Sequence, residues 1–434
     1  MAAGGPRDEG AGAPRGGGAL APFRSGSFRG LWTGTVASSL GASVASVAFA
    51  WFVYATTHDA LAVTLLGISN FAPGLVVGLL AGALADRYER RRLMILADLV
   101  PAAGVGLLAA FFVLRGFDLP VVLTTVVVVA AMGALFRPAS NALLPQILPG
   151  EQLPDANGLL LSGMTAGGFV GSAVGGVLIV LVGAATDFSI NALTYVVSAA
   201  MIAFVVLPPA RRAPSPLPTA GRRSLVGDVR EGLAYVRSQP ALLWTIVGSL
   251  GANFFLAIYG TYEVVYVLSF LRAGAAVYGV VAAMNGIGFG VGSLATGRLG
   301  AVRRAGLVYI GTWASGGLLI VELAFVRSVP NTIAVFAVVG FLGGLGNTTY
   351  LACVQRIVPE ALLGRFFSID EVGSFAIIPL GQVAGGVLLT LVGVPTTYVL
   401  CGAGAFACTA TLLLSRSVRR LGVGPAGRAE PSAM

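Results

Sequence analysis

A few ionisable side chains interrupt the long apolar stretches of this sequence, and the chemistry they offer is proton binding. Glu263 is the most suggestive of them. The aromatic and polar residues near it in the same stretch are Tyr259, Tyr262, Tyr266 and Asn253. An ionisable group in hydrocarbon costs about 3 kcal/mol or more, so each one marks a candidate functional site. The pattern predicts a protonatable carboxyl group in the wall of a site for an organic ligand. The alternative is a glutamate that meets water near the outer end of its stretch.

Other acidic residues in apolar stretches are weaker candidates for binding a proton or a ligand. Glu322 also lies toward the outer end of its stretch. Asp98 lies early in its stretch, and Asp370 with Glu371 begins another, so these three lie near one membrane face. At that position we expect them to be partners of a gate between the helices and not of a ligand.

Several chemistries are excluded by the residues that the sequence lacks. No lysine occurs in the 434 residues, whereas a nucleotide-binding loop of the Walker A type needs its lysine to reach the phosphates. The three cysteines have neither CxxC spacing nor histidines near them, and His58 is the only histidine. We therefore expect no nucleotide, no cofactor and no metal site. An enzyme would need clustered catalytic groups, so we expect a protein that is not an enzyme.

The composition requires a lipid environment. Hydrophobic residues make up 56% of the chain and charged residues only 10%, and the mean hydropathy is +0.88. Apolar stretches of about 20 residues, long enough to cross the hydrocarbon as a helix, recur along the chain. The twelve expected spans are 31–55, 61–84, 93–114, 120–142, 157–182, 187–207, 241–270, 276–298, 305–326, 331–353, 367–393 and 395–415. The sequence thus predicts an all-α membrane protein.

The net charge of +9 follows membrane topology and does not indicate nucleic-acid binding. Only Arg115, Arg272 and Arg327 fall in loops on one side of the expected topology, and the other arginines fall on the opposite side. Positive residues are enriched in cytoplasmic loops. We therefore expect both termini to be cytoplasmic, in a multi-pass protein of the cell (inner) membrane.

The loop between the second and third spans carries a glycine, an acid and a basic cluster. It resembles the loop at the same place in major facilitator transporters, whose pattern is Gly-x-x-x-Asp-Arg-x-Gly-Arg-Arg. The matching residues are Gly82, Asp86, Arg87, Arg90 and Arg91. Glu89 stands where the family usually has glycine. A basic loop that only obeys the charge rule would explain the arginines but not the spacing from Gly82 to Asp86.

The resemblance implies two six-helix bundles with a ligand site between them. The bundles would cover 31–207 and 241–415, between cytoplasmic tails 1–30 and 416–434. The linker 208–240 is proline-rich and then amphipathic, which predicts a short helix on the membrane surface around Leu225–Val236. The halves also repeat at an offset of 210 residues, where Gly183 corresponds to Gly393 and Pro149 to Pro359.

A row of small residues in the fifth span resembles the family's antiporter motif. The matching glycines are Gly158, Gly167, Gly171, Gly175 and Gly176, and Ser172 replaces the motif's proline. Small residues at this spacing let a neighbouring helix approach closely. We expect spans five and eight to face each other, with mates at Gly286, Gly288, Gly290 and Gly292. An importer or uniporter of the same fold would not need this motif.

The segment from Phe136-Arg137-Pro138 to Glu151, with Asn157 and Asn191, resembles the efflux subgroup that includes enterobactin exporters and macrolide pumps. The resemblance covers essentially the whole chain. It implies export of a mid-sized organic molecule. We expect export of a small organic or amphipathic compound, of the drug, antibiotic or siderophore type, in exchange for protons, and we expect the protein to be a monomer. An importer or uniporter of the same fold is the alternative.

A gate on the cytoplasmic side follows from the same motifs. Asp86 can lie against the N-terminus of span eleven, where unpaired backbone amides carry partial positive charge. Arg137, at the cytoplasmic end of span four, is placed to pair with Asp86. Asp370 lies near the same helix start, where its negative charge would also be favourable, but it could repel Asp86. We expect these contacts only when the bundles close on that side.

Overall fold

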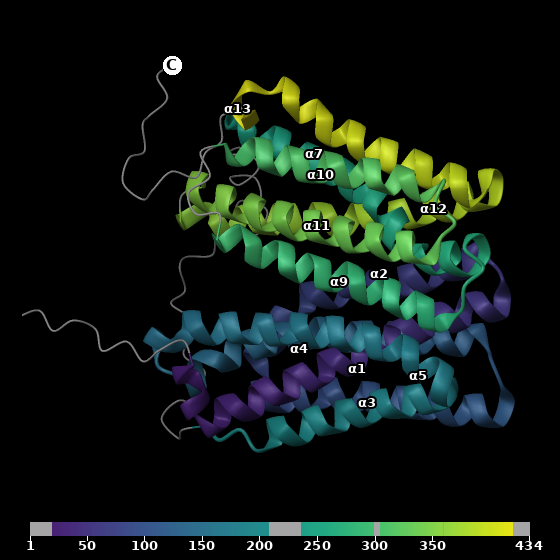
Figure 1. Cartoon of the computed structure of the whole chain (residues 1–434). Coiled ribbons are helices and arrows are strands. Elements are labelled where there is room, and N and C mark those ends of the chain that lie inside the picture. Colours follow the sequence, from purple (N-terminus) through teal and green to yellow (C-terminus); the bar gives the residue numbers. More distant parts are fainter. Residues whose placement is uncertain (1–19, 208–235, 299–303, 359, 420–434) are drawn as a thin grey trace, which may run out of the picture.

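Long apolar helices run side by side through the chain (Figure 1). The computed structural model describes residues 20–207, 236–298, 304–358 and 360–419. The long helices are α1 (Gly26–Thr57), α2 (Ala60–Arg87), α3 (Arg90–Arg115), α4 (Leu119–Ile147), α5 (Leu153–Ala203), α7 (Pro240–Thr261), α9 (Ala275–Arg298), α10 (Ala305–Leu323), α11 (Val329–Ile357) and α12 (Glu360–Ala410). The architecture confirms the predicted all-α membrane fold.

Two of these helices are hairpins of two membrane spans. α5 and α12 contain 51 residues each, about 77 Å at 1.5 Å per residue, whereas the hydrocarbon is only about 30 Å thick. Each is interrupted by a glycine at positive φ, Gly183 at 73° and Gly393 at 74°. Only glycine adopts this conformation readily. With both hairpins counted as two spans, the described chain contains the twelve predicted spans, and the two repeat-related glycines share one backbone conformation.

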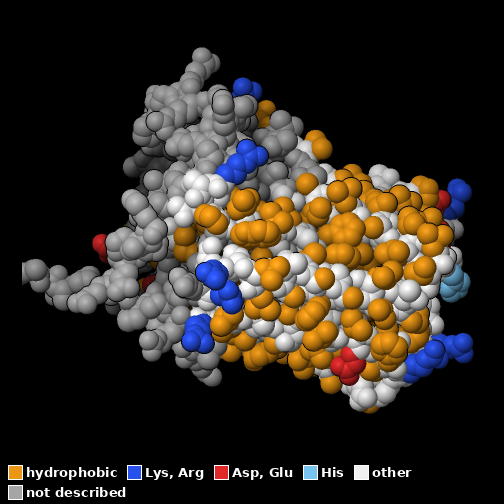
Figure 2. All heavy atoms as spheres, turned by 90° about the horizontal axis from the view of Figure 1, so that it is seen from above, with side chains coloured by type: hydrophobic (Ala, Val, Ile, Leu, Met, Phe, Trp, Pro, Cys, Tyr) orange, Lys and Arg blue, Asp and Glu red, His pale blue; other side chains and the backbone are white. Residues whose placement is uncertain are grey.

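The helices form two bundles, α1–α5 and α7–α12, which lie one above the other in Figure 1. Both described ends of the chain, Leu20 and Arg419, lie on one side of the molecule, here called the terminal side. Gly183 and Gly393 lie on the other side, here called the hairpin side. Figure 2 shows a broad belt of hydrophobic side chains between these sides, with arginines near its edges. Such a belt is the surface that lipid would cover.

The buried side chains show how the bundles meet. On the hairpin side one continuous core includes residues of both bundles, such as Val47 and Phe188 from the first and Tyr262 and Phe336 from the second. On the terminal side the largest described clusters are separate, one within each bundle. In this conformation the described bundles are therefore packed together on the hairpin side and are less joined on the terminal side.

Span seven is irregular near its hairpin end. The sequence predicts one span over 241–270, but α7 ends at Thr261. A short helix α8 (Glu263–Val265) and a π-helical turn η4 (Tyr266–Phe270) follow. Such π-turns inside helices are frequent at functional sites. The side chains of residues 262–267, after the break, are all buried.

Two predicted boundaries are wrong. The predicted tail 1–30 ends earlier, because Ala21–Arg24 forms a 3₁₀ turn (η1) and α1 begins at Gly26. The Ser25 side chain accepts a hydrogen bond from the Phe28 amide and so caps α1, while Phe28 is fully buried. At the other end, Arg416–Arg419 forms a short helix, α13. The rest of both tails and the predicted surface helix at 225–236, save Val236, lie outside the described residues.

Candidate functional site

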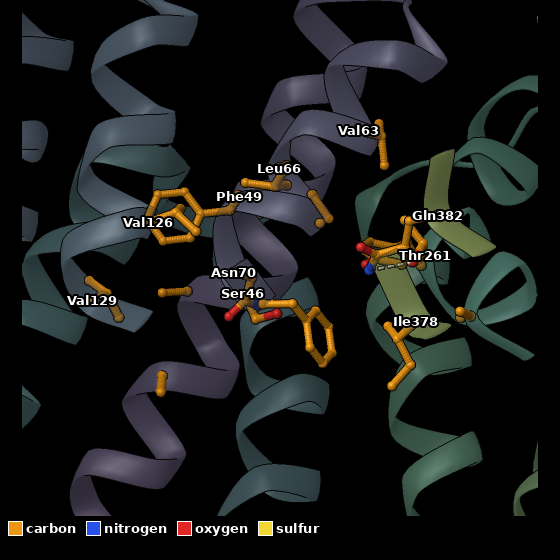
Figure 3. Close-up of a pocket in the computed structure, with 18 of the residues that line it drawn as sticks. Ser46, Phe49, Val63, Leu66, Asn70, Val126, Val129, Thr261, Ile378 and Gln382 are labelled. Atoms are coloured by element: carbon orange, nitrogen blue, oxygen red, sulfur yellow. Dashed lines mark hydrogen bonds between the residues drawn. The ribbon is translucent and has the colours of Figure 1, made fainter. Parts of the chain in front are cut away.

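A cavity of about 530 Å³ lies between the two bundles. One wall comes from α1, α2, α4 and the second span of α5, and the other from α7, α9 and α12 (Figure 3). The lining includes eight residues with hydroxyl or amide side chains, which are Ser46, Asn70, Asn191, Tyr195, Asn253, Thr261, Tyr278 and Gln382. The remaining lining is aliphatic, aromatic or glycine. A cavity of this size and lining suits an organic ligand of drug size.

The polar groups of the cavity come from both bundles. Ser46 and Asn70 lie close together on the wall of the first bundle (Figure 3). On the facing wall the Gln382 Nε2 donates a hydrogen bond of 3.1 Å to the Thr261 Oγ1. A ligand here would contact both bundles at once. Its binding would thus depend on how the bundles are arranged.

Of the residues predicted to line a ligand site around Glu263, only Asn253 does so. The predicted wall is not formed by Glu263, Tyr259 and Tyr262, because all three are buried on the hairpin side and none of them lines the cavity. Glu263 is 9% exposed, and its Oε1 has no hydrogen-bond partner among the described residues. The Tyr259 hydroxyl accepts a hydrogen bond of 2.7 Å from the Asn285 amide. Glu263 is therefore a buried acid that does not form part of the cavity wall.

Tyr262 instead joins the two bundles. Its hydroxyl lies 2.6 Å from the Thr64 Oγ1 of the first bundle and donates a 2.5 Å hydrogen bond to the Gln382 carbonyl of the second. Tyr262 is fully buried. Because Thr64 is on α2 and Gln382 on α12, this group fastens the hairpin ends of spans two and eleven together.

Replacing Tyr262 with phenylalanine should loosen the hairpin side. The change removes the hydroxyl, and each hydrogen bond contributes about 0.5–1.5 kcal/mol net, a factor of about 2 to 13 in an equilibrium. We expect a cysteine placed at Ser46, in a chain without its native cysteines, to react faster with an impermeant thiol reagent added from the hairpin side. Tyr88→Phe on the exposed terminal loop is the control. Equal labelling in Tyr262→Phe and the parent would show that the hydroxyl does not hold this side closed.

The glycines of the antiporter-like motif contact a different partner from the one expected. A Cβ on Gly167 or Gly175 would approach backbone oxygens of α1, 3.0 Å from Val36 and 2.8 Å from Val44, and Gly171 faces α1 in the same way. Gly158 has open space around it. On α9, Gly286 and Gly290 receive the ring of Phe169, while Gly288 and Gly292 pack against α11. The motif therefore mainly packs spans one and five of the same bundle.

Spans five and eight do face each other, through one glycine of the motif. Gly176 lies against Gly279, and a Cβ added to either residue would overlap the backbone of the other. The serine in place of the motif's proline leaves the helix regular, because the only non-helical backbone inside α5 is at Gly183. The Ser172 hydroxyl donates to the Gly168 carbonyl at 3.1 Å within the same helix. Close approach of the bundles here depends on the Gly176–Gly279 pair.

A second cavity, of about 370 Å³, extends from the central one into the first bundle. The two share Ala42, Asn70, Val129 and Tyr195, while Asp98 and Arg137 line only the second. Asp98 is 1% exposed and accepts hydrogen bonds from the Ser198 hydroxyl at 2.6 Å and the Ser38 hydroxyl at 3.4 Å. Asp98, one of the weaker proton or ligand candidates from the sequence, thus lines a cavity.

The predicted gate is only partly described. The side chains of Asp86 and Glu371 and the surroundings of Gly82 lie outside what the structure describes. Arg137 lines the second cavity with Asp98. Asp370 lines a third cavity, of about 160 Å³, in which Asn253 donates a 3.1 Å hydrogen bond to Ser374. The pairing of Asp86 with Arg137 stays a prediction.

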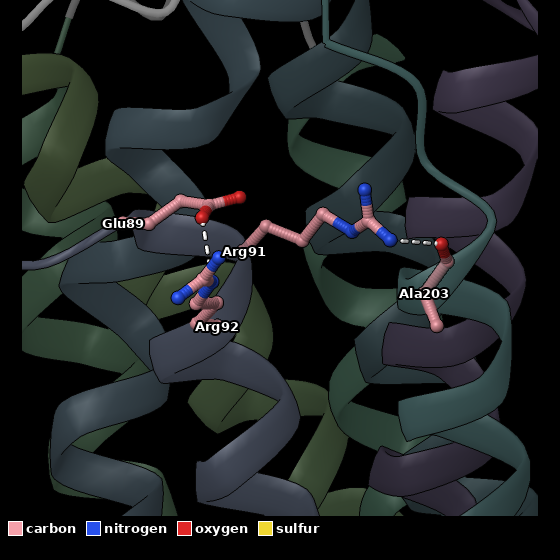
Figure 4. Close-up of polar contacts among 4 residues, drawn as sticks. All are labelled: Glu89, Arg91, Arg92 and Ala203. Carbon is pink, nitrogen blue, oxygen red and sulfur yellow. Dashed lines mark hydrogen bonds and ion pairs between the residues drawn. The ribbon is translucent and has the colours of Figure 1, made fainter.

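The loop with the basic cluster has an unstrained backbone at Glu89, the residue that differs from the family pattern. Glu89 has φ −61°, which any residue adopts, so glycine is not required there. Its carboxylate forms a 2.7 Å ion pair with Arg92, and Arg91 donates a hydrogen bond to the Ala203 carbonyl at the end of α5 (Figure 4). Arg87 is exposed. Glu89 therefore replaces the glycine without disturbing the turn.

Two kinds of polar residue escaped the sequence analysis. Asn70 and Gln382 are neutral amides in apolar spans, and the desolvation argument applied to acids could have found them. Asp187 is fully buried four residues after Gly183, and neither carboxyl oxygen has a hydrogen-bond partner among the described residues. Its counterpart in the repeat, Thr397, is also fully buried. Glu322, by contrast, is exposed on α10.

Two bundles of six spans around a shared cavity are the architecture predicted from the resemblance to major facilitator transporters. The chain belongs to the family described as transmembrane secretion effector, whose model matches residues 17–423. It is therefore a multi-pass membrane transporter and not an enzyme.

Known relatives and one solved structure agree with this assignment. The chain is 25% identical to the multidrug efflux pump Tap of Mycolicibacterium fortuitum, over 84% of this chain and 89% of the pump. It is 25% identical to macrolide efflux protein A of Streptococcus pyogenes, over 86% of this chain and 92% of that protein. The crystal structure of nucleoside transporter NupG superimposes with a TM-score of 0.65 at 12% identity, covering 89% of this chain and 98% of NupG. This last match concerns the fold alone.

Proposed function

We propose that the protein exports a small organic or amphipathic compound in exchange for protons by alternating access. The observation that carries this proposal is the cavity of about 530 Å³ that both bundles line and that is packed shut on the hairpin side. The efflux activity named for the pumps Tap and macrolide efflux protein A supports the outward direction. One copy of the chain supplies the whole cavity, which supports a monomer.

The terminal side is the cytoplasmic side in this proposal. Described arginines on the hairpin side are Arg115, Arg272 and Arg327. Those toward the terminal side whose side chains are described are Arg24, Arg29, Arg87, Arg90, Arg91, Arg92, Arg137, Arg237, Arg304, Arg416 and Arg419. The excess supports cytoplasmic termini in the cell membrane by the positive-inside rule. The conformation is then inward-facing, the state in which an exporter collects its substrate.

Asp98 is the residue that binds the driving proton in this proposal. It is a buried acid in the membrane, and such groups mark proton relays. It also lines a cavity joined to the substrate cavity. The groups around it are the hydroxyls of Ser38 and Ser198, the phenol of Tyr195 and the guanidinium of Arg137. Glu263, the first choice from the sequence, is buried and lines neither of these two cavities.

The cytoplasmic gate would close by bringing Asp86 and Arg137 together near the start of span eleven. Asp370 and the arginines of the loop, Arg87, Arg90 and Arg91, would set the balance between the open and closed states without touching substrate. In the inward-facing state Arg137 faces the Asp98 cavity instead. Movement of Arg137 between Asp98 and Asp86 would connect the proton site with the gate.

Transport by the purified full-length chain in liposomes tests the function. We expect an inward-directed proton gradient to drive uphill movement of a substrate, found by screening uncharged and cationic organic compounds, toward the hairpin side. Movement toward the terminal side would favour an importer. Movement only down the substrate gradient, without effect of the proton gradient, would favour a uniporter.

A further inference from the structure

We infer that the central cavity selects compounds without net charge, so that each exchange for a proton moves positive charge across the membrane. This inference rests on the proposed proton-driven export and names its substrate class. The first observation is the lining itself. Among the 22 described residues that line the cavity, none is Asp, Glu, Arg or His.

A charged ligand would gain little from such a wall. Ions lose hydration when they enter a protein cavity and need a counter-charge to regain that free energy. The eight hydroxyl and amide side chains of this cavity both donate and accept hydrogen bonds. They suit uncharged carbonyl, hydroxyl, ether and amide groups on an otherwise apolar molecule. Uncharged amphipathic compounds are therefore the ligands that this wall solvates best.

The charges beside the cavity do not change this conclusion. In the second cavity the acid Asp98 and the base Arg137 face the same space, so a cation drawn to one would be repelled by the other. Both oxygens of Asp98 already accept hydrogen bonds from serines. On the other side, Asp370 lines the smaller cavity of about 160 Å³, behind Asn253 and Leu256, which are part of both walls.

The charge of the substrate determines how the membrane potential acts on export. Exchange of an uncharged molecule for one proton carries one positive charge inward per cycle. Exchange of a monovalent cation for one proton carries none. A potential that is negative on the cytoplasmic side would therefore accelerate export of an uncharged compound and leave one-for-one cation exchange unaffected.

A pair of probes with one fluorophore tests the inference. Dansylamide is uncharged at neutral pH, whereas dansylcholine carries a permanent quaternary ammonium. Binding of each to the purified full-length chain is measured first, and transport into liposomes follows with the potential set by a potassium gradient and valinomycin. We expect dansylamide to bind at least about tenfold more tightly than dansylcholine. We expect the uphill transport of dansylamide toward the hairpin side to become faster as the terminal side is made more negative.

A single substitution should reverse the preference. Asn70 is exposed to both cavities, and Asn70→Asp places a carboxylate on the wall without a large change of shape. We expect Asn70→Asp to strengthen dansylcholine binding at least about tenfold and to weaken dansylamide binding. Asn70→Ser, which removes the amide without adding charge, is the matched control and should not bind dansylcholine more tightly.

The outcomes separate this inference from the proposed function. Wild-type binding of dansylcholine as tight as that of dansylamide overturns the selection for uncharged compounds, even when both are exported. Uphill export of dansylamide that ignores the membrane potential overturns the charge movement. A dansylamide that binds in the cavity but never moves against its gradient overturns proton-driven export itself, and the binding preference then stands alone.

Discussion

Replacing Gly176 with valine is expected to reduce transport at least about fivefold, because the bundles could no longer close on the hairpin side. A Cβ at Gly176 would overlap the backbone of Gly279, so the two helices would have to separate. Overpacking of this kind typically costs about 1–3 kcal/mol. That free energy lowers the population of the inward-facing state by a factor of about 5 to 150. The measurement is the initial rate of uphill export in liposomes.

The same motif provides a matched control. A Cβ at Gly158 would meet nothing within 4 Å, so Gly158→Val should leave transport nearly unchanged. Accessibility should also change in Gly176→Val, with a cysteine at Ser46 reacting faster from the hairpin side than in the parent. Normal transport in Gly176→Val would show that the close helix contact is not part of the transport cycle.

Replacing Asp98 with asparagine is expected to abolish export driven by the proton gradient while exchange of substrate for substrate continues. The amide is permanently neutral and has nearly the shape of a protonated carboxyl group, so it mimics one state of the cycle. The cavities and the bundles should be unaffected, since asparagine can still accept a hydrogen bond from Ser198. Both activities are measured in the same liposomes, with and without a proton gradient.

Two further variants determine which acid couples transport. Glu322 is exposed on α10, and Glu322→Gln should transport normally. Glu263→Gln tests the buried acid on the hairpin side. Proton-driven export that persists in Asp98→Asn but disappears in Glu263→Gln would move the proton site from the terminal-side cavity into the hairpin-side core.

The fold was largely predictable because lipid imposes a simple rule on the sequence. Every span needs about 20 apolar residues, so the spans could be located from composition, and Gly183 and Gly393 already corresponded in the repeat. The start of α1 was harder to locate. The start depends on the Ser25 cap and on the burial of Phe28. The length and position of an apolar stretch do not reveal either feature.

The site was less predictable, because it depends on which way each side chain faces. Glu263 and Asn253 lie on the same predicted span, yet only Asn253 lines the cavity, and the helix is broken between them after Thr261. A span that is apolar all round contains no periodic signal for such a break. The partners of the motif glycines were missed for a similar reason, as spacing identifies a close contact but not the helix that makes it.

The core on the hairpin side has a consequence for how the chain could be assembled. Because residues of both bundles contribute to one continuous core there, the peptide link between Leu207 and Val236 is not what holds the halves together in this conformation. The two halves, produced as separate polypeptides in one membrane, should associate and restore transport. A Gly176→Val half should fail to complement its partner, so reconstitution from fragments would report directly on the strength of the contact between the bundles.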